Sequence, residues 1–268
     1  MHFMKKTIFI LLFTFIFVCP NIYALDFGNN ITISDNSIGS YNSWYSDRED
    51  QEVEPGCVGN QTWDLEGFFL NDFKLTTVGG FDFKQGEEGY TSGDIFIDTD
   101  LDAIYGLDGK YKDSLSGNGQ KQYFYDYGYE YAVDLDFNNL TYKVYEIDKT
   151  YNSLISVYYR QNDGSNPWRY NPQQNQDPIY MGSISYYENL SDSTTGLLGG
   201  NHNAFTIDLS FLPENTEFIA HFTIGCGNDN LMGQGIAHAP EPATLFLLGT
   251  GMIGLAVITR KRTSFKRD

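Results

Sequence analysis

The feature that most constrains the fold of this chain is a long run in which apolar and polar residues alternate. From Tyr123 to Phe137 every odd-numbered position is aromatic or aliphatic, whereas Asp126, Glu130 and Asp134 occupy even-numbered positions. A period of two is typical of a β-strand with one buried face and one face in water. The run therefore predicts a half-buried strand.

The residues after this run predict a β-hairpin. The asparagines at 138–139 suit a two-residue turn, because Asn tolerates the positive φ angles that such a turn requires. With that turn Val133 pairs with Val144 in the core, and Asp134 lies opposite Lys143 on the wet face. A slip of one residue would break all the apolar pairs together.

Further short apolar runs alternate with clusters of Gly, Asn and Asp, and no convincing amphipathic helix lies between them. Many short strands without helices pair antiparallel. The expected fold class is all-β, an antiparallel β-sandwich of jelly-roll type. The further strands are expected at residues 62–70, 73–77, 81–83, 94–98, 154–159, 179–187, 204–211 and 218–225.

The N-terminal segment has the pattern of a secretory signal peptide. Lys5 and Lys6 precede an apolar run at residues 7–18, and residues 22–24 offer a cleavage site before Leu25. We therefore expect a signal peptide helix at residues 1–24, export through the Sec translocon and removal by signal peptidase. The alternatives are a lipid anchor at Cys19 and a protein that spans the membrane twice. Neither is favoured, because no small residue precedes this cysteine and both terminal apolar runs are shorter than about 20 residues.

The C-terminal segment combines three elements in a fixed order. Pro240-Glu241-Pro242-Ala243 cannot form a regular helix or sheet, so it stays accessible to another protein. The apolar residues 245–259 come next and predict a single transmembrane helix, and the basic residues 260–262 favour a cytoplasmic end.

This C-terminal arrangement resembles the PEP-CTERM sorting signal, which the membrane protease-transpeptidase exosortase recognises in Gram-negative bacteria. The motif residues correspond to Pro240, Glu241, Pro242 and Ala243, and residues 239–268 form the whole signal. The resemblance implies a transient anchor in the inner membrane, cleavage near the motif, and transfer to the cell surface or to an extracellular matrix such as a biofilm. It implies exosortase as a partner and an exopolysaccharide-rich destination, but no enzymatic activity.

The segment between the two signals, residues 25–238, is expected to be one extracytoplasmic domain. The chain has 35 acidic and 17 basic residues, and the terminal segments remove seven basic but only two acidic ones, which leaves 33 acidic and 10 basic residues. Such a surface repels phosphate groups, so we expect no nucleic-acid partner. It favours cations and neutral sugars. The 20 Phe, 20 Tyr and 3 Trp residues provide ample apolar surface for a core.

The cysteines predict one disulfide bond. Of the three cysteines, Cys19 belongs to the signal peptide, which leaves Cys57 and Cys226 in an oxidising compartment. A bond between them would close a loop over most of the domain and constrain the unfolded chain by about 4 kcal/mol. Two separate buried thiols and a thiol nucleophile are the alternatives.

A run of alternating carboxylates is the best candidate for a metal site. Asp94, Asp98, Asp100 and Asp102 lie on one face of an extended segment. Calcium takes six to eight oxygen ligands, and such a run can supply three or four of them. The spacing of an EF-hand loop is absent, and a solvated strand edge explains the same residues without an ion.

Aromatic residues in a polar, turn-rich segment are candidates for carbohydrate binding. Trp168 and Tyr170 lie at its centre and Tyr180 comes after it. Aromatic rings on a loop can stack on the apolar faces of sugar rings. Alternatively, the tryptophan anchors the loop to the domain.

No catalytic motif is present. The chain has neither the Gly-x-Ser-x-Gly elbow of hydrolases nor a His-Glu-x-x-His zinc helix, and His202, His221 and His238 are scattered. We therefore expect an exported surface or matrix protein that is not an enzyme. A calcium-assisted carbohydrate-binding module and a secreted polysaccharide hydrolase with paired carboxylates are the alternatives.

Overall fold

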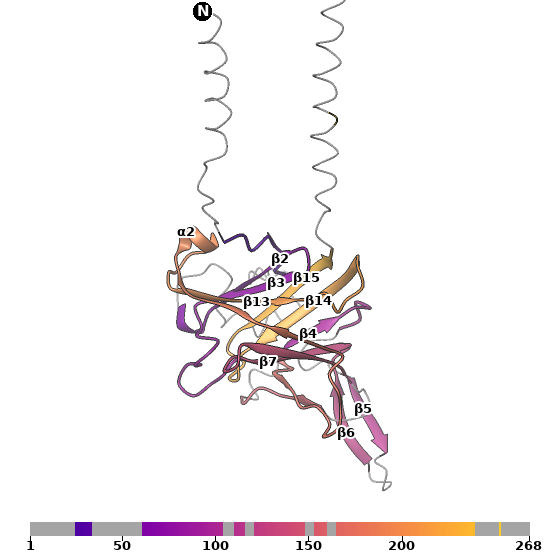
Figure 1. The fold of residues 1–268 in the computed structure, drawn as a ribbon. Helices are drawn as coiled ribbons and strands as arrows, with labels where there is room; N and C mark the ends of the chain where they lie inside the picture. Colours follow the sequence, from indigo (N-terminus) through magenta and orange to yellow (C-terminus); the bar gives the residue numbers. More distant parts are fainter. Residues whose placement is uncertain are drawn as a thin grey trace, which may run out of the picture.

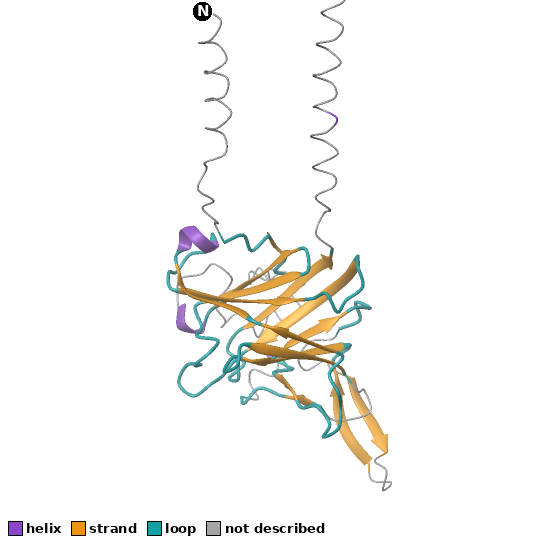
Figure 2. Cartoon of the chain, in the orientation of Figure 1, coloured by secondary structure: helices purple, strands orange, loops and turns teal. Residues whose placement is uncertain are grey.

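The computed structural model describes the body of the chain between its two terminal segments. The described residues are 25–33, 61–103, 110–115, 121–147, 153–159 and 165–238, together with Met252, and residues 110–115 and 121–125 are described by their backbone alone. Strands dominate the described body, whose helices are the short turns η2 (Gln61–Trp63) and α2 (Asp192–Thr195) (Figure 2). The expectation of an all-β fold is confirmed.

Two large antiparallel sheets make up most of the described body (Figure 1). The first sheet has the order β1 (Asn29–Asn30), β2 (Leu65–Asn71), β3 (Lys74–Gly79), β13 (His202–Asp208) and β12 (Ser185–Leu190). The second sheet has the order β11 (Tyr180–Ser183), β8 (Thr141–Glu146), β7 (Tyr131–Asp136), β4 (Ile95–Asp98), β14 (Thr216–Thr223) and β15 (Asn230–Ala237). Two separate strand pairs are β5 (Lys110–Leu115) with β6 (Lys121–Asp126), and β9 (Leu154–Ile155) with β10 (Arg169–Tyr170).

The two large sheets share one hydrophobic core. Phe205 of β13 comes from the first sheet, while Val133 of β7 and Phe222 of β14 come from the second, and all three are fully buried in the same cluster. Phe83, from the loop after β3, joins the two layers, since its ring centroid lies 4.9 Å from that of Phe205 and 5.8 Å from that of Phe222. Each such aromatic ring contributes about 1.5–3 kcal/mol by leaving water. The sheets are thus packed face to face, and the jelly-roll topology stays a prediction.

The predicted register of the hairpin is confirmed. In the ladder between β7 and β8, Val133 pairs with Val144 and Asp134 pairs with Lys143. The two valines are fully buried, whereas Lys143 is exposed, as the alternation requires. The hydrophobic pattern therefore predicted the pairing correctly.

The expectation of one continuous strand from Tyr123 to Phe137 is wrong. Strand β6, which pairs with β5 in a separate ladder, ends at Asp126, and β7 of the second sheet begins at Tyr131. The break occurs at Gly128, which has φ +84° and donates its N–H to the Asp126 carboxylate at 3.0 Å. A glycine adopts this backbone conformation without strain. The alternation of apolar and polar residues continues across the bend, so the sequence pattern does not reveal where the strand is interrupted.

The hairpin turn also differs from the predicted one. The residue with positive φ is Leu140, at +52°, rather than either asparagine. Asp136 stabilises the turn instead, because its Oδ1 accepts the backbone N–H groups of Asn138 at 3.1 Å and Asn139 at 3.0 Å. The turn is therefore stabilised by a carboxylate that accepts two backbone hydrogen bonds. It does not depend on asparagines with positive φ angles.

Strand β15 is missing from the predicted strands because its inward positions carry small residues. Gly233 and Gly235 face the first sheet, and a Cβ atom there would lie 3.0 Å from Phe68 Cδ2 and 2.8 Å from Leu70 Cδ2 respectively. The edge strand can therefore approach β2 closely only with glycine at these positions. In the sequence the same glycines suggest a loop.

The other predicted strands coincide with observed ones apart from three. The expectation of a single strand at 179–187 is wrong, because the chain forms β11, which pairs with β8 of the second sheet, and then β12, which pairs with β13 of the first sheet. Residues 81–83 lie in a loop, although Phe81 and Phe83 are buried in the core, and the run at 154–159 is a strand only at Leu154–Ile155. Apolar content indicated burial correctly at residues 81–83 but not the backbone conformation. At 154–159 it indicated neither, since Val157 is buried but Ile155, Tyr158 and Tyr159 are exposed.

The predicted signal peptide helix at residues 1–24 and transmembrane helix at residues 245–259 lie outside the described residues, apart from Met252. Within the described residues, no helix has the length and apolar character needed to cross a membrane.

Candidate functional site

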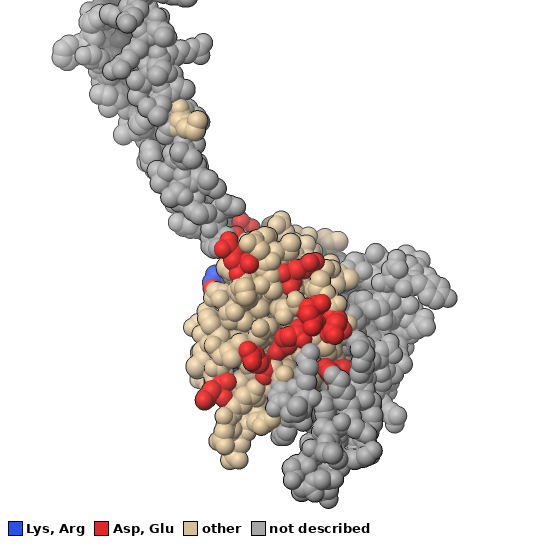
Figure 3. All heavy atoms as spheres, turned by 90° about the vertical axis from the view of Figure 1, so that its right-hand side faces the viewer, with Lys and Arg blue, Asp and Glu red and all other residues tan. Residues whose placement is uncertain are grey.

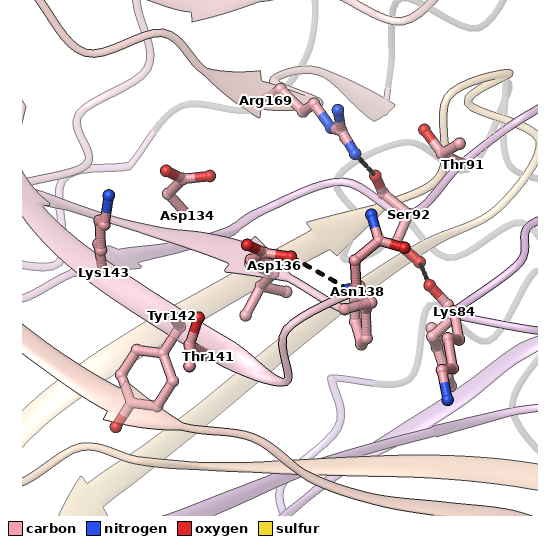
Figure 4. Close-up of a pocket in the computed structure, with 13 residues that line it drawn as sticks. Lys84, Thr91, Ser92, Asp134, Asp136, Asn138, Thr141, Tyr142, Lys143 and Arg169 are labelled. Atoms are coloured by element: carbon pink, nitrogen blue, oxygen red, sulfur yellow. Dashed lines mark hydrogen bonds between the residues drawn. The ribbon is translucent and has the colours of Figure 1, made fainter.

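A polar cleft opens beside the β7–β8 hairpin of the second sheet. Its volume is about 410 Å³, and β7, β8, residues 83–84, residues 91–92 and β10 contribute its lining (Figure 4). Side chains of both charges meet there. The charged residues are Asp134, Asp136, Lys84, Lys143 and Arg169.

Asp134 is the half-buried carboxylate of this cleft. Burial raises its pKa, whereas the nearby charges of Lys143 and Arg169 act to lower it. Figure 4 shows the carboxylate beside Lys143, with Arg169 further away and directed toward Ser92. Among the described residues Asp134 accepts no hydrogen bond, so its solvation depends on what occupies the cleft.

Arg169 forms the side of the cleft opposite the hairpin. Its Nε and Nη2 donate to the carbonyl oxygen of Ser92 at 3.2 Å and 3.0 Å, and its guanidinium group lies 4.9 Å from the ring centroid of Trp168. Two backbone bonds and a cation–π contact fix this side chain. The positive wall is therefore rigid.

Asp94 lies buried next to this cleft and links three elements. Its Oδ1 accepts the backbone N–H of Leu135 at 3.1 Å and its Oδ2 accepts that of Tyr170 at 2.8 Å. Burial raises the pKa of Asp94 to about 7, the charge of Asp134 adds to the rise, and the two backbone bonds oppose it. This residue acts as a structural acceptor and not as an exposed ligand.

Asp98 organises the loop after β4. Its carboxylate accepts the backbone N–H groups of Asp100 at 3.0 Å, Leu101 at 2.7 Å and Ala103 at 2.7 Å. Burial raises its pKa to about 6, although these three bonds oppose the rise. The loop conformation is thus explained by one buried carboxylate.

The structure brings together only part of the predicted carboxylate set. Oxygens of Asp98, Asp100 and Glu130 lie within 4.8 Å of one another, so these three residues could hold a cation. Asp94 and Asp102 do not belong to this group. Glu130, which the sequence did not single out, joins it because its N–H bonds to Ile97 O at 3.0 Å, next to Asp98. Only the pairing of β4 with β7 could have revealed it.

The aromatic residues predicted to bind sugars are largely covered. Trp168 and Tyr170 are 6% and 5% exposed, so neither ring offers a face for stacking. Trp168 packs against Tyr158 with a centroid distance of 5.0 Å, and the half-buried Tyr180 packs against Phe211 at 6.0 Å. The loop-anchoring alternative therefore describes Trp168 and Tyr170. The exposed rings in this region are those of Tyr158, at 62%, and Tyr159, at 42%.

The two buried histidines have structural partners. His202 lies between the carboxylates of Glu66 and Asp192, at 2.6 Å and 3.0 Å. His221 contacts the carbonyl oxygen of Pro167 at 2.9 Å through Nε2, and burial lowers its pKa to about 4. Both connect segments that are distant in the sequence.

The chain leaves the described body directly from the edge strand β15. Ala237 O accepts the N–H of Asn215 at 2.7 Å, and Nδ1 of His238 lies 2.9 Å from Asn215 Oδ1. The turn before β14 therefore contacts the last residue of the body. The motif residues Pro240, Glu241, Pro242 and Ala243 lie outside the described residues.

The N-terminal segment of the body lies beside the same strand. Gln234 N donates to Ile31 O at 3.0 Å and Ile33 N donates to Met232 O at 2.8 Å, while β1 pairs with β2. Residues 29–33 thus connect the edges of the two sheets. Figure 1 shows this indigo segment and the end of β15 at the same end of the body.

Comparison with known families identifies the segment after β15. Residues 238–262 match the family described as the PEP-CTERM protein-sorting motif. The chain carries a PEP-CTERM sorting signal. The resemblance seen in the sequence is confirmed for this segment, which starts one residue after β15 ends. No curated protein and no solved structure matches the chain.

The PEP-CTERM motif gives no information about the predicted disulfide. Cys226 is buried at the edge of the main core, on the inward face predicted for it, whereas Cys57 lies outside the described residues. The bond between them stays a prediction.

Proposed function

We propose that this protein is an exported, non-catalytic component of the cell surface or extracellular matrix, and that exosortase processes its PEP-CTERM signal. The observation that carries the proposal is the match at residues 238–262, directly after the last strand of an all-β body. The acidic composition of that body and the secretory pattern of residues 1–24 are consistent with it.

The proposed route begins with the Sec translocon and signal peptidase. The C-terminal residues then anchor the chain in the inner membrane by a single helix, with the Pro-Glu-Pro element at the outer interface. Exosortase cuts there and transfers or releases the body, a jelly-roll-like sandwich. Its destination is a matrix rich in exopolysaccharide.

Intact mass spectrometry of the mature protein tests this route. We expect the wild-type mass to end close to Pro240–Pro242, and Glu241→Ala to leave the C-terminal segment attached. Glu214→Ala is the matched control, because Glu214 is an exposed glutamate on the turn before β14. Identical processing of the wild type and Glu241→Ala would refute the role of exosortase.

A second candidate function is calcium-assisted carbohydrate binding. The observation that favours it is the proximity of Asp98, Asp100 and Glu130. These oxygens would supply the ligands, and the remaining positions would be filled by backbone carbonyls, water or a sugar hydroxyl.

A further inference from the structure

The protein contains two cross-strand pairs of lysine and aspartate that differ in one respect. Lys74 lies opposite Asp208 in the ladder between β3 and β13, and their Nζ and Oδ2 atoms are 2.5 Å apart. Lys143 lies opposite Asp134 in the ladder between β7 and β8. Within the described residues this second pair forms neither an ion pair nor a hydrogen bond. Both pairs are directly opposite in their ladders, yet only Lys74 and Asp208 form an ion pair. We refer to Lys74 and Asp208 as the closed pair and to Lys143 and Asp134 as the open pair.

The open pair lies in the polar cleft, where two other side chains make no hydrogen bond to a described residue. These are Thr141 and Lys84, although the Nζ atom of Lys84 lies 6.0 Å from the ring centroid of Tyr186. Asp136, in contrast, is engaged by the turn, since its Oδ2 accepts from Asn139 Nδ2 at 2.7 Å. A half-buried carboxylate that accepts no hydrogen bond from the described residues keeps acceptor positions open toward the cleft, so Asp134 can accept from a molecule bound there.

Cations are concentrated in this cleft against the general charge of the body. Lys84, Lys143 and Arg169 are three of only 10 basic residues left between the terminal segments, and all three line the cleft. On the face that Figure 3 shows, acidic side chains are scattered widely and hardly any basic one is visible. The cleft therefore combines cationic hydrogen-bond donors with the available carboxylate of Asp134. The rest of the body is mainly acidic.

We propose that this cleft binds a neutral saccharide unit of a polysaccharide. A sugar hydroxyl both donates and accepts hydrogen bonds, so two adjacent hydroxyls can donate to Asp134 and accept from Lys143 at the same time. Thr141 and Lys84 supply further polar contacts at the rim. The volume of about 410 Å³ lies within the range of small-ligand sites.

The charge of the body decides between a neutral and an anionic sugar. With 33 acidic and 10 basic residues the body repels a polyanionic chain at long range. Inside the cleft, the Asp134 carboxylate would also face the acid group of a uronate. A neutral hydroxyl-rich ligand satisfies both charges without a net electrostatic cost. The inference rests on the proposed role in an exopolysaccharide matrix, which would supply such a ligand.

Isothermal titration calorimetry on the exported protein tests the cleft. The probes are the glucose hexaoses maltohexaose and cellohexaose, mannohexaose, and polygalacturonate as the anionic polymer. We expect at least one neutral hexaose to bind, with an affinity that stays the same between low and high salt. Asp134→Asn and Lys143→Gln should each weaken binding about tenfold or more, because each removes a charged hydrogen-bond partner.

Lys74→Gln is the matched control, since it changes the closed pair outside the cleft, and we expect its affinity to equal that of the wild type. The melting temperatures of both cleft variants should stay close to that of the wild type, because neither side chain has a hydrogen bond to a described residue to lose. Absence of binding to every neutral hexaose would overturn the proposal. Salt-sensitive binding of polygalacturonate alone, or equal weakening by the Lys74 variant, would overturn it as well.

This outcome is separable from the sorting proposal. Failure to bind sugar in a protein whose cleavage still depends on Glu241 would overturn the cleft alone. Binding in a protein whose cleavage ignores Glu241 would overturn the sorting route alone.

Discussion

Replacement of Asp94 by asparagine should change the pH dependence of stability in a defined direction. The carboxyl of Asp94 is 2% exposed and accepts two backbone N–H bonds, and burial raises its pKa to about 7 from an ordinary value of 3.8. Between these two values the unfolded chain loses the proton while the folded chain keeps it. The contribution of Asp94 to folding is therefore fully present below about pH 4 and is lost as the pH rises through about 7.

The magnitude is set by the separation of the two pKa values. About three units at roughly 1.4 kcal/mol per unit correspond to about 4 kcal/mol of stability lost between pH 4 and pH 8. Asparagine has no such dependence, but its Nδ2 group faces one of the two backbone donors, which costs about 1–2 kcal/mol. The variant should be less stable than the wild type at pH 4 and more stable at pH 8.

Urea unfolding of both proteins at pH 4, 5, 6, 7 and 8 measures this difference. The difference is the informative quantity, because His221 acts in the opposite sense: burial lowers its pKa to about 4, so its contribution is lost as the pH falls below about 6.5. Both proteins contain His221, and its effect cancels. The control is Asp177→Asn, on an exposed loop, whose curve should run parallel to that of the wild type. A difference between Asp94→Asn and the wild type that stays constant from pH 4 to 8 would contradict the reasoning.

Two further substitutions test the loop after β4 and the approach of β15 to the first sheet. Asp98→Ala removes the acceptor of three backbone N–H groups, and we expect a loss of about 2–4 kcal/mol in chelator, measured by urea unfolding. A melting temperature that calcium raises in the wild type but not in Asp100→Asn would assign an ion to the group Asp98, Asp100 and Glu130. Gly233→Val places methyl groups against Phe68 and should cost about 1–3 kcal/mol or more, whereas Gln234→Val, on the exposed face of β15, should stay within about 0.5 kcal/mol of the wild type. Equal stability of the two β15 variants would show that the strand can move away from β2.

The sequence predicted the elements whose signal is local and periodic. The β7–β8 register was predictable because each position of the hairpin repeats the same test: buried Val133 must meet buried Val144 while Asp134 meets Lys143. The bend at Gly128 was not predictable in the same way. It preserves the alternation, and only the positive φ of one residue separates β6 from β7.

The candidate sites depend on contacts between distant segments, which explains why only parts of them were predicted. Asp94 looked like one member of an acidic row, but its partners Leu135 and Tyr170 are 41 and 76 residues away. Their N–H groups turn an apparent metal ligand into a buried acceptor. Trp168 likewise looked exposed because its neighbours are polar, whereas packing against Tyr158 covers it. No local pattern distinguishes these alternatives.

The register of the second sheet places the cleft far from the end of β15. Ala237 pairs with Thr216 at one end of β14, whereas Val133, beside the cleft, pairs with Ile95, which lies level with Phe222 near the other end. The separation along the strands is about six residues, or about 20 Å, and three strand spacings across the sheet add about 14 Å. A body held at the end of β15 would therefore present the cleft away from the point of attachment. Figure 1 shows β7, which lines the cleft, well below the end of β15. Anchoring and saccharide binding are thus geometrically compatible, and the same chain could bind matrix polymer before and after its PEP-CTERM signal is removed.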